Sequence, residues 1–325
     1  MSRIGITTTV PVEIILAAGH TPVDLNNVFI TGQEPSRLVE KAEAAGYPRN
    51  ICGWIKGLYS IAAEPGYVDM VLAVTQGDCS NTQALMETLE LAGVETIPFA
   101  FPFDRDYDML QLQMQKLAIR LGADWLAVEV MKQRLDRIRA KVSEIDRLTW
   151  QQNCVSGLNN HLFQVSCSDF NGDLVKFEQD LDAFLLQTKQ SPEWQEDLRL
   201  GYIGVPPIFT DLYQYIEEMG ARVVYNEVQR QFAMPVVVAD IVEQYRKYTY
   251  PYGVFGRIED IRAEIERRNL DGIIHYVQSF CFRQIEDMIF REKLDVPILS
   301  IEGDKPGKLD ARTRLRIDSF LEMLR

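Results

Sequence analysis

The sequence predicts an α/β fold of two Rossmann-like or flavodoxin-like domains, each with a parallel sheet, joined by a helical segment. Short apolar runs alternate with longer stretches of helical periodicity, which is typical of parallel sheets. A strongly helical segment interrupts this alternation, which then begins again. The chain has 325 residues, enough for two domains, and 46% of them are hydrophobic, so we expect a sizeable core.

Proline and glycine mark the ends of the first helices. The helix that begins at Pro11 is expected to end at Gly19, and the helix over 36–46 is expected to end at Gly46. This follows because proline favours the first turn of a helix and glycine favours its end. Three strands are predicted among these helices: "PVDLNNVFI" (22–30), "YVDMVLAVT" (67–75) and "ETIPFAF" (95–101).

Helical spacing dominates the middle of the chain. Leu, Ile and Met recur at that spacing over 107–122 and 125–150, so two long helices are expected there. We place the domain boundary after the second helix, which gives domains 1–150 and 151–325. The alternation then returns with a strand and loop over 199–209 and with strands at 221–228, 271–277 and 296–303.

Composition and charge exclude some classes of function. The formal net charge is −13, which argues against a general nucleic-acid surface because phosphate binding needs clustered Lys and Arg. The N-terminal apolar run is broken by Pro11 and Glu13 and does not have the form of a secretory signal peptide. No stretch reaches about 18 uninterrupted apolar residues, so no membrane span is predicted. We therefore expect a cytoplasmic protein.

The cysteines do not form a pattern of disulfides or of a common zinc site. There are five of them, no CxxC pair occurs, and the chain has only three histidines. An odd count in a large chain argues against a disulfide framework. Scarce histidine and the lack of an HExxH motif also disfavour a zinc hydrolase. The cysteines are Cys52, Cys79, Cys154, Cys167 and Cys281.

Cys79 and Cys281 lie in the same local sequence pattern. Each follows an apolar run and a short loop and precedes a predicted helix, in "AVTQGDCSNTQAL" and in "DGIIHYVQSFCFRQIEDMIF". Ligands of open parallel sheets bind outside the carboxyl ends of the strands. Helix N-termini stabilise thiolates. Cys52 also precedes a predicted helix start, beside Gly53, where a bulky group could approach the backbone.

Two interpretations of these thiols remain open. If the two domains face each other across a cleft, the thiolates of Cys52, Cys79 and Cys281 could converge there. They could then hold three irons of a [4Fe–4S] cluster, with the fourth iron open as a Lewis acid. Alternatively they are packed apolar thiols, which is the commoner fate of cysteine. We expect Cys154 and Cys167, which lie in a largely helical segment, to fill the core.

Hydroxyl and imidazole groups are further candidates. Thr8, with its neighbours Thr7 and Thr9, could bind a substrate oxygen or a phosphate, or could cap the following helix. His275 is expected at a strand end, six residues before Cys281, where it could donate a proton or be a structural histidine. His161 has an apolar background and is interpreted as a core or interface residue.

Charged side chains offer two further candidate sites. A local basic cluster could bind an anionic ligand or form a solvated helix face. Two carboxylates, Glu13 and Glu227, lie near apolar runs, where burial would raise their pKa. The basic cluster consists of Lys305, Lys308, Arg312 and Arg314.

Taken together, these segments resemble the 2-hydroxyacyl-CoA dehydratase family, which includes benzoyl-CoA reductase subunits and double-cubane-cluster reductases. The resemblance covers nearly the whole chain. It is carried by "VPVEIILAAGHTPVDL", "NICGWIKG", "VTQGDCSNTQALMETL", "HYVQSFCFRQIEDMIF" and "VPILSIEGDKPGKLDARTRLRIDSFLEML".

The resemblance implies a fold, a cofactor and partners. It implies two Rossmann-like domains and an iron–sulfur cluster held by cysteines that correspond to Cys52, Cys79 and Cys281. It also implies a homodimer, or a heterodimer with a related subunit, and a separate ATP-hydrolysing iron–sulfur activator that supplies one electron at low potential. In the dehydratases that electron makes a ketyl radical of an acyl-CoA thioester, from which the 2-hydroxyl leaves.

Several alternatives remain. No sequence feature fixes an acyl-CoA pocket. The chain could be a double-cubane-type reductase of small molecules, but two bridged clusters need six cysteine ligands and the chain has five. It could also be a two-domain ligand-binding protein without redox chemistry, in which the three cysteines need not converge.

Overall fold

The computed structural model describes residues 1–188, 193–195 and 198–325, and its contacts divide the chain into two compact units. Neither unit is a single stretch of chain. The predicted boundary at residue 150 is the end of helix α7 (Trp125–Trp150), and the change from unit 1 to unit 2 falls within that helix. Unit 1 comprises Met1–Ala140, Ser166–Glu178 and Met234–Gly253, and unit 2 comprises Lys141–Val165, Gln179–Ala233 and Val254–Arg325.

Each unit contains a four-stranded parallel sheet, which confirms the predicted α/β class. The two sheets have the same order, with the first strand of the unit inside and the second at an edge. Unit 1 has the order β2 (Thr21–Asp24), β1 (Arg3–Ile6), β3 (Met70–Gln76) and β4 (Glu95–Ala100). Unit 2 has the order β6 (Ala221–Asn226), β5 (Leu198–Ile203), β7 (Gly272–Gln278) and β8 (Ile298–Gly303).

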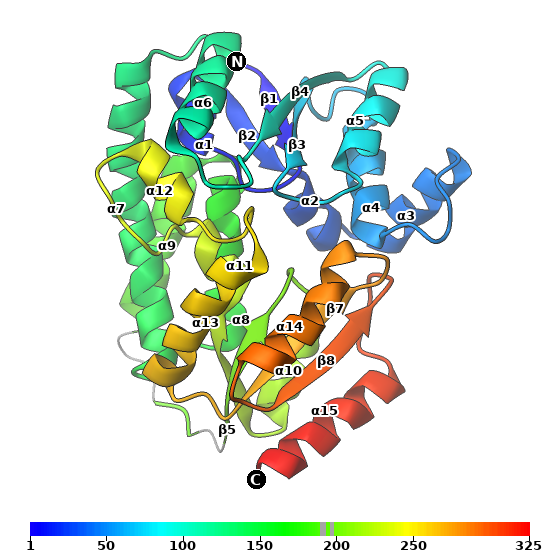
Figure 1. Ribbon diagram of the computed structural model, residues 1–325, viewed down its shortest axis with the longest axis vertical. Helices are drawn as coiled ribbons and strands as arrows, with labels where there is room; N and C mark the ends of the chain where they lie inside the picture. The colour runs from blue at the N-terminus through cyan, green and yellow to red at the C-terminus, as the bar shows by residue number, and fades with distance from the viewer. Residues whose placement is uncertain (189–192, 196–197) are drawn as a thin grey trace. The chain divides into compact units, whose positions relative to one another are not determined.

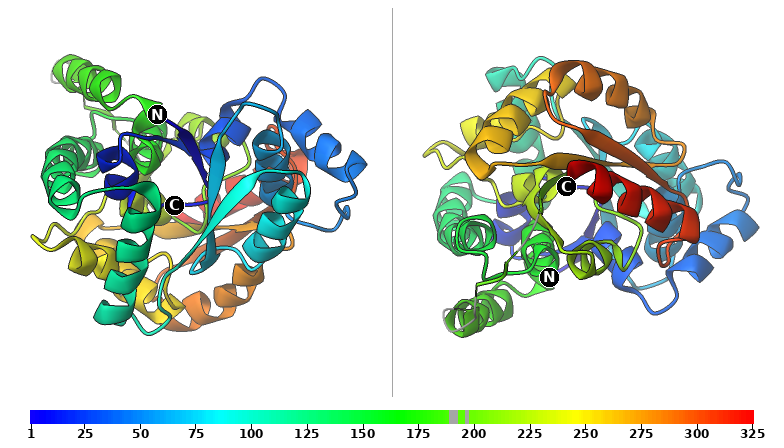
Figure 2. Two further views of the ribbon diagram at one scale, coloured as in Figure 1. Left: turned by 90° about the horizontal axis from the view of Figure 1, so that it is seen from above. Right: turned by 90° about the horizontal axis from the view of Figure 1, so that it is seen from below.

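The sheet of unit 1 has helices on both faces (Figure 2, left). Helix α1 packs against α6 on one face, and α4 packs against α5 on the other. Residues 71–74 of β3 are completely buried, as expected for a strand covered on both sides. The helices are α1 (Val12–Ala17), α2 (Leu25–Thr31), α3 (Pro35–Ala44), α4 (Gly53–Ala62), α5 (Thr82–Leu91), α6 (Tyr107–Leu121) and α12 (Ile241–Lys247), with short 3-10 helices η1 (Ser166–Ser168) and η2 (Phe170–Gly172).

In unit 2, α13 and α14 cover one face of the sheet. Their apolar residues form one cluster with β5, β6 and β7, which includes Ile203, Val224 and Ile273. Helix α15 lies along β8 (Figure 1). The helices are α8 (Gly157–Val165), α10 (Leu212–Glu218), α11 (Glu227–Phe232), α13 (Val254–Arg268), η3 (Phe282–Ile285), α14 (Glu286–Lys293) and α15 (Ala311–Leu324); α9 (Leu174–Thr188) is divided between the units.

Most predicted elements are present, but one strand is half wrong. The segment 22–30 forms only the short strand β2 and then turns into helix α2. The reason is a capping contact: the Asp24 side chain accepts a hydrogen bond from the Asn26 backbone N–H, 2.9 Å away, and so begins a helix. As predicted, Gly19 and Gly46 lie just beyond the ends of α1 and α3, and both have a positive φ.

The sequence predicted no membrane span, and the helices of the structure can be compared with that prediction. Across the described ranges, none of the helices combines the length and the apolar character that a bilayer crossing requires.

Candidate functional site

Cys79 and Cys281 occupy corresponding positions in the two units. Strand β3 ends at Gln76 and β7 ends at Gln278, and in each case the cysteine follows three residues later. Both strands pair with the first strand of their unit, whose other neighbour is the second strand. The winding of the sheet reverses at that point, which is where ligands of open α/β sheets bind. The predicted order of strand, short loop, cysteine and helix is therefore present twice.

The Cys79 sulfur is directed to the start of helix α5. The Asn81 backbone N–H donates to Cys79 Sγ over 3.4 Å, and the Thr82 N–H donates to the Cys79 carbonyl over 3.1 Å. The cysteine is partly exposed. An amide donor and a helix N-terminus both stabilise negative charge on the sulfur. The turn is thus suited to present a thiolate.

Cys52 is the N-cap residue of helix α4, as its place before Gly53 predicted. Its side chain is buried, and its carbonyl accepts a bond from the Lys56 N–H over 3.3 Å. Helix α4 contacts α5, the helix that follows Cys79. Cys52 and Cys79 therefore lie at the N-terminal ends of two helices that pack together in unit 1.

Cys281 is the N-cap residue of η3 and follows a strained residue. Phe280 has a φ of 65°, in the left-handed region that a bulky side chain rarely adopts. Two residues after the cysteine, Arg283 forms an ion pair with Glu286 over 3.2 Å, and Glu286 also contacts Arg257. Ion pairs from two helices thus hold the segment that carries Cys281.

The raised pKa that the sequence left possible for Glu227 does not occur in the structure. This residue is fully buried, and burial alone would raise its pKa. Arg257 binds both of its oxygens, over 2.6 and 2.9 Å, and the Gly204 N–H donates to it over 3.0 Å. These contacts hold the pKa of Glu227 below its ordinary value. The other carboxylate, Glu13, is also buried and pairs with Arg139 over 2.6 Å.

The threonines after β1 do not cap helix α1, so that prediction is wrong. The N-cap residue is Pro11, and no side-chain cap bond is present. Thr7 Oγ1 instead accepts a hydrogen bond from the Val74 N–H over 3.1 Å, which ties the loop to β3. Thr8 is buried beside it, at the carboxyl edge of the sheet.

The sequence predicted His275 at the end of a strand. In the structure it lies in the middle of strand β7. The ring is buried, and its Nδ1 is 2.7 Å from an oxygen of Asp287. This contact, together with Ser300 and Arg291, holds the pKa of Asp287 well below its ordinary value. Phe290 packs edge-on against the imidazole, with ring centroids 5.1 Å apart. The position of the imidazole is therefore tightly fixed.

The remaining candidates are the other two cysteines, His161 and the basic cluster, and most of them pack against or bind neighbouring protein groups. Cys167 is fully buried, which raises the pKa of its thiol to about 12, as expected for core packing. Cys154 is only partly buried, unlike the core residue that was predicted, and its Sγ is 3.7 Å from the Leu148 carbonyl. His161 shares hydrogen bonds with Tyr213 and Gln229 in unit 2. In the basic cluster Arg314 pairs with Asp211 over 2.7 Å, while the cluster's other members, Lys305, Lys308 and Arg312, are exposed.

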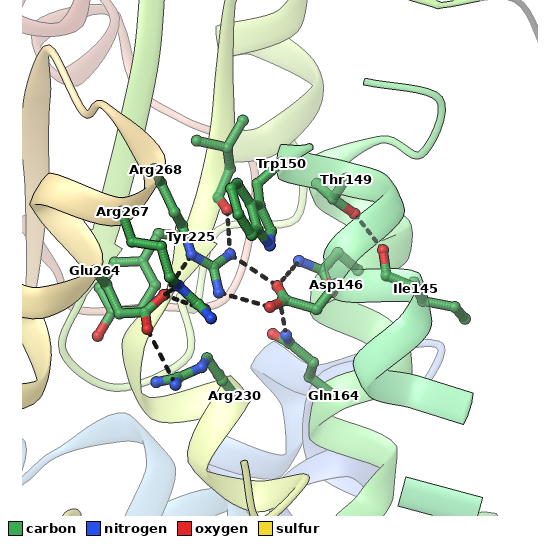
Figure 3. A network of polar contacts seen from close by, with 12 residues as sticks. Ile145, Asp146, Thr149, Trp150, Gln164, Tyr225, Arg230, Glu264, Arg267 and Arg268 are labelled. Carbon is green, nitrogen blue, oxygen red and sulfur yellow. Dashed lines mark hydrogen bonds and ion pairs between the residues drawn. The ribbon is translucent and has the colours of Figure 1, made fainter. Parts of the chain in front are cut away.

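Unit 2 contains a buried ion-pair network that the sequence did not predict (Figure 3). Arg268 binds Asp146 of α7 over 2.6 Å and Glu264 over 2.6 Å, and Glu264 also pairs with Arg230. Burial would raise the pKa of Asp146, but Arg268 holds it below the ordinary value. In the sequence Asp146 is one charge among many on a long helix, so no signal distinguished it from a solvated residue.

The chemistry of the side chains suits an iron–sulfur cluster. All five cysteines are thiols rather than disulfides, and thiolates are the usual ligands of such clusters. Within the described residues, the buried donors Trp54 Nε1 and Thr82 Oγ1 have no hydrogen-bond partner. They follow Cys52 and Cys79 closely, and cluster sulfides accept such bonds. Over residues 1–188, 193–195 and 198–325, no three His, Cys, Asp or Glu side chains lie together in a group that could hold a metal ion.

Comparison with known proteins identifies the family. No curated protein matches this chain. The family model "2-hydroxyglutaryl-CoA dehydratase, D-component" matches residues 7–324, which include every candidate residue described above. This match supports a dehydratase-type enzyme component. The chain belongs to the 2-hydroxyglutaryl-CoA dehydratase D-component family.

Proposed function

We propose that this chain is the iron–sulfur subunit of an oxygen-sensitive 2-hydroxyacyl-CoA dehydratase-like enzyme. In this proposal Cys52, Cys79 and Cys281 together hold three irons of one [4Fe–4S] cluster. The observation that carries it is that Cys79 and Cys281 each follow, by three residues, the strand at the switch point of their own sheet. The family match is independent support.

The residues around the cluster have defined tasks in this proposal. When bound, the cluster supplies an open iron that acts as a Lewis acid toward a substrate oxygen. The Thr8 hydroxyl orients that part of an acyl-CoA substrate. His275, whose Nδ1 is held by Asp287, moves a proton at Nε2. The amide donor at Cys79 Sγ stabilises the charge on its thiolate.

Partners are needed for the electron and for the assembly. The electron comes from an ATP-hydrolysing iron–sulfur activator in the cytoplasm. The chain assembles as a homodimer or with a related subunit. Exposed apolar side chains on two successive helices of unit 1 favour this assembly: Met109, Leu112 and Ile119 on α6, and Leu126 and Val130 on α7.

Serine substitution of the cysteines tests the proposal. Cys52→Ser, Cys79→Ser and Cys281→Ser, purified without oxygen, should each lose most of the bound iron and acid-labile sulfide. Cys154→Ser and Cys167→Ser are the matched controls and should retain the wild-type amounts. If all five variants resemble the wild type, the three thiols are packing groups and the chain is a ligand-binding protein without redox chemistry.

A further inference from the structure

A segment from the second half of the chain is built into unit 1. Residues Met234–Gly253 belong to unit 1, although the chain on both sides of them belongs to unit 2. We call this segment the strap. It is fixed by long-range hydrogen bonds: Lys132 Nζ donates to the Val238 carbonyl over 2.6 Å, and Tyr107 OH donates to Asp240 over 2.9 Å.

Tyr245, in the middle of the strap, also binds residues at the start of helix α1. Tyr245 is fully buried, and its OH lies 2.8 Å from both the Val10 carbonyl and Glu13 Oε2. Its ring stacks with Phe101, with centroids 6.5 Å apart. These contacts anchor the strap in unit 1.

The end of the strap lies on the Cys79 turn. Tyr250 OH donates to Asp78 Oδ1 over 3.0 Å, and Asp78 directly precedes Cys79. One residue earlier, Gly77 has a φ of 100°, and a Cβ at this position would come within 2.8 Å of Pro251. The backbone of the turn and the strap therefore approach closely, and only glycine allows that approach.

The turn is consequently held from two directions. On one side the Asn81 and Thr82 amides bind the Cys79 sulfur and carbonyl. On the other side the Tyr250 hydroxyl holds the carboxylate of Asp78, and a hydrogen bond to a charged acceptor is stronger than a neutral one. The Tyr250 side chain is itself buried, so this donor is preorganised.

We infer that Tyr250 is a positioning residue for Cys79. By binding Asp78, Tyr250 fixes the turn of residues 77–82 and so holds the Cys79 thiolate in the position from which it binds the cluster. This inference rests on the proposed function for its role toward the cluster, whereas the fixing of the turn can be measured in the cluster-free protein. Ligand geometry determines how firmly a metal group is held, and residues beyond the ligands commonly set that geometry.

The test compares two matched substitutions in the strap. Tyr250→Phe removes the hydroxyl that binds Asp78. Tyr252→Phe removes a hydroxyl that donates to the Tyr245 carbonyl over 3.2 Å and does not contact the turn. Amide hydrogen exchange of residues 77–82 is measured in both full-length, cluster-free variants. We expect exchange about tenfold faster in Tyr250→Phe and within about twofold of wild type in Tyr252→Phe.

The second measurement uses protein reconstituted with iron and sulfide. Tyr250→Phe should lose iron to a chelator about tenfold faster than wild type and show a changed EPR spectrum, while Tyr252→Phe should match wild type. Asp78→Asn keeps an acceptor for Tyr250 and should retain most of the wild-type behaviour.

The outcomes separate the two claims. Unchanged exchange in Tyr250→Phe, or equal effects in both tyrosine variants, would overturn the inference, because the strap would then have only a general structural role. Equal iron loss in wild type and Tyr250→Phe would overturn it as well. A wild-type chain that binds no iron, with faster exchange in Tyr250→Phe, would instead contradict the proposed function and leave the fixing of the turn established.

Discussion

At the scale of single residues, Asp24 and Asp169 form a buried pair of carboxylates in unit 1. The Asp24 backbone N–H donates to Asp169 Oδ2 over 2.7 Å, and Ser168 Oγ donates to Asp24 over 2.5 Å. Burial, with the added charge of Asp24, raises the pKa of Asp169 to about 7. Because folding raises this pKa, the protonated form is favoured in the native state. Its contribution to stability is therefore lost as the pH rises toward 7.

This pair predicts a pH dependence that one substitution removes. Between pH 5 and pH 8, Asp169 should lower the free energy of unfolding by on the order of 2 kcal/mol. In Asp169→Asn that part of the decrease should be absent. Urea unfolding of both proteins at the two pH values measures the difference. Parallel changes in the two proteins would show that the pKa of Asp169 is not raised.

The candidate residues differ in how far the sequence could predict their positions. The place of Cys79 follows from local signals, because an apolar run, a glycine and capping residues mark a strand, a turn and a helix. The surroundings of Glu227 depend on Arg257, which comes from another helix, and no local pattern reveals such a partner. The contact between Tyr250 and Asp78 joins residues far apart in the chain and could not be predicted for the same reason.

At the scale of elements, the packing of α4 on α2 determines how the Cys52 segment is held. Gly57 of α4 faces the Phe29 ring of α2 so closely that a Cβ would lie 2.3 Å from a ring carbon. Phe29 also packs edge-on against Trp54, with centroids 5.4 Å apart. The missing side chain at Gly57 is therefore what allows the two helices to approach.

A methyl group at this position should disturb the helix pair. Gly57→Ala is expected to lower the free energy of unfolding by about 1–3 kcal/mol, the usual cost of overpacking a core. Gly253→Ala is a suitable control, because a Cβ there meets no atom within 4 Å. Combining Gly57→Ala with Phe29→Leu should restore part of the loss. Equal stability of Gly57→Ala and wild type in urea unfolding would contradict the packing argument.

At the scale of the whole molecule, neither compact unit is a continuous stretch of sequence. Residues 166–178 and 234–253 belong to unit 1 but lie between segments of unit 2. A prediction from periodicity can place a boundary at the end of a helix, and ours lies at residue 150. It cannot reveal that a later segment returns to an earlier sheet, because that return depends on contacts distant in the chain.

The proposed assembly gives a prediction for the intact chain. We expect a native mass of at least twice the 37.3 kDa of one chain when it is measured by light scattering. Ile119 on α6 is 81% exposed, so Ile119→Arg should shift the protein toward monomer without unfolding it. Val175→Arg, at a position 55% exposed on α9, is the control and should leave the mass unchanged. A wild-type monomer would exclude self-association on this surface.

The measurement that tests the central claim most directly is the iron and sulfide content of the wild-type protein purified without oxygen, with an EPR spectrum after reduction. The account predicts about four irons and four sulfides per chain and the signal of a reduced [4Fe–4S] cluster. Protein that is folded, pure and free of both elements, even after anaerobic reconstitution, would contradict it.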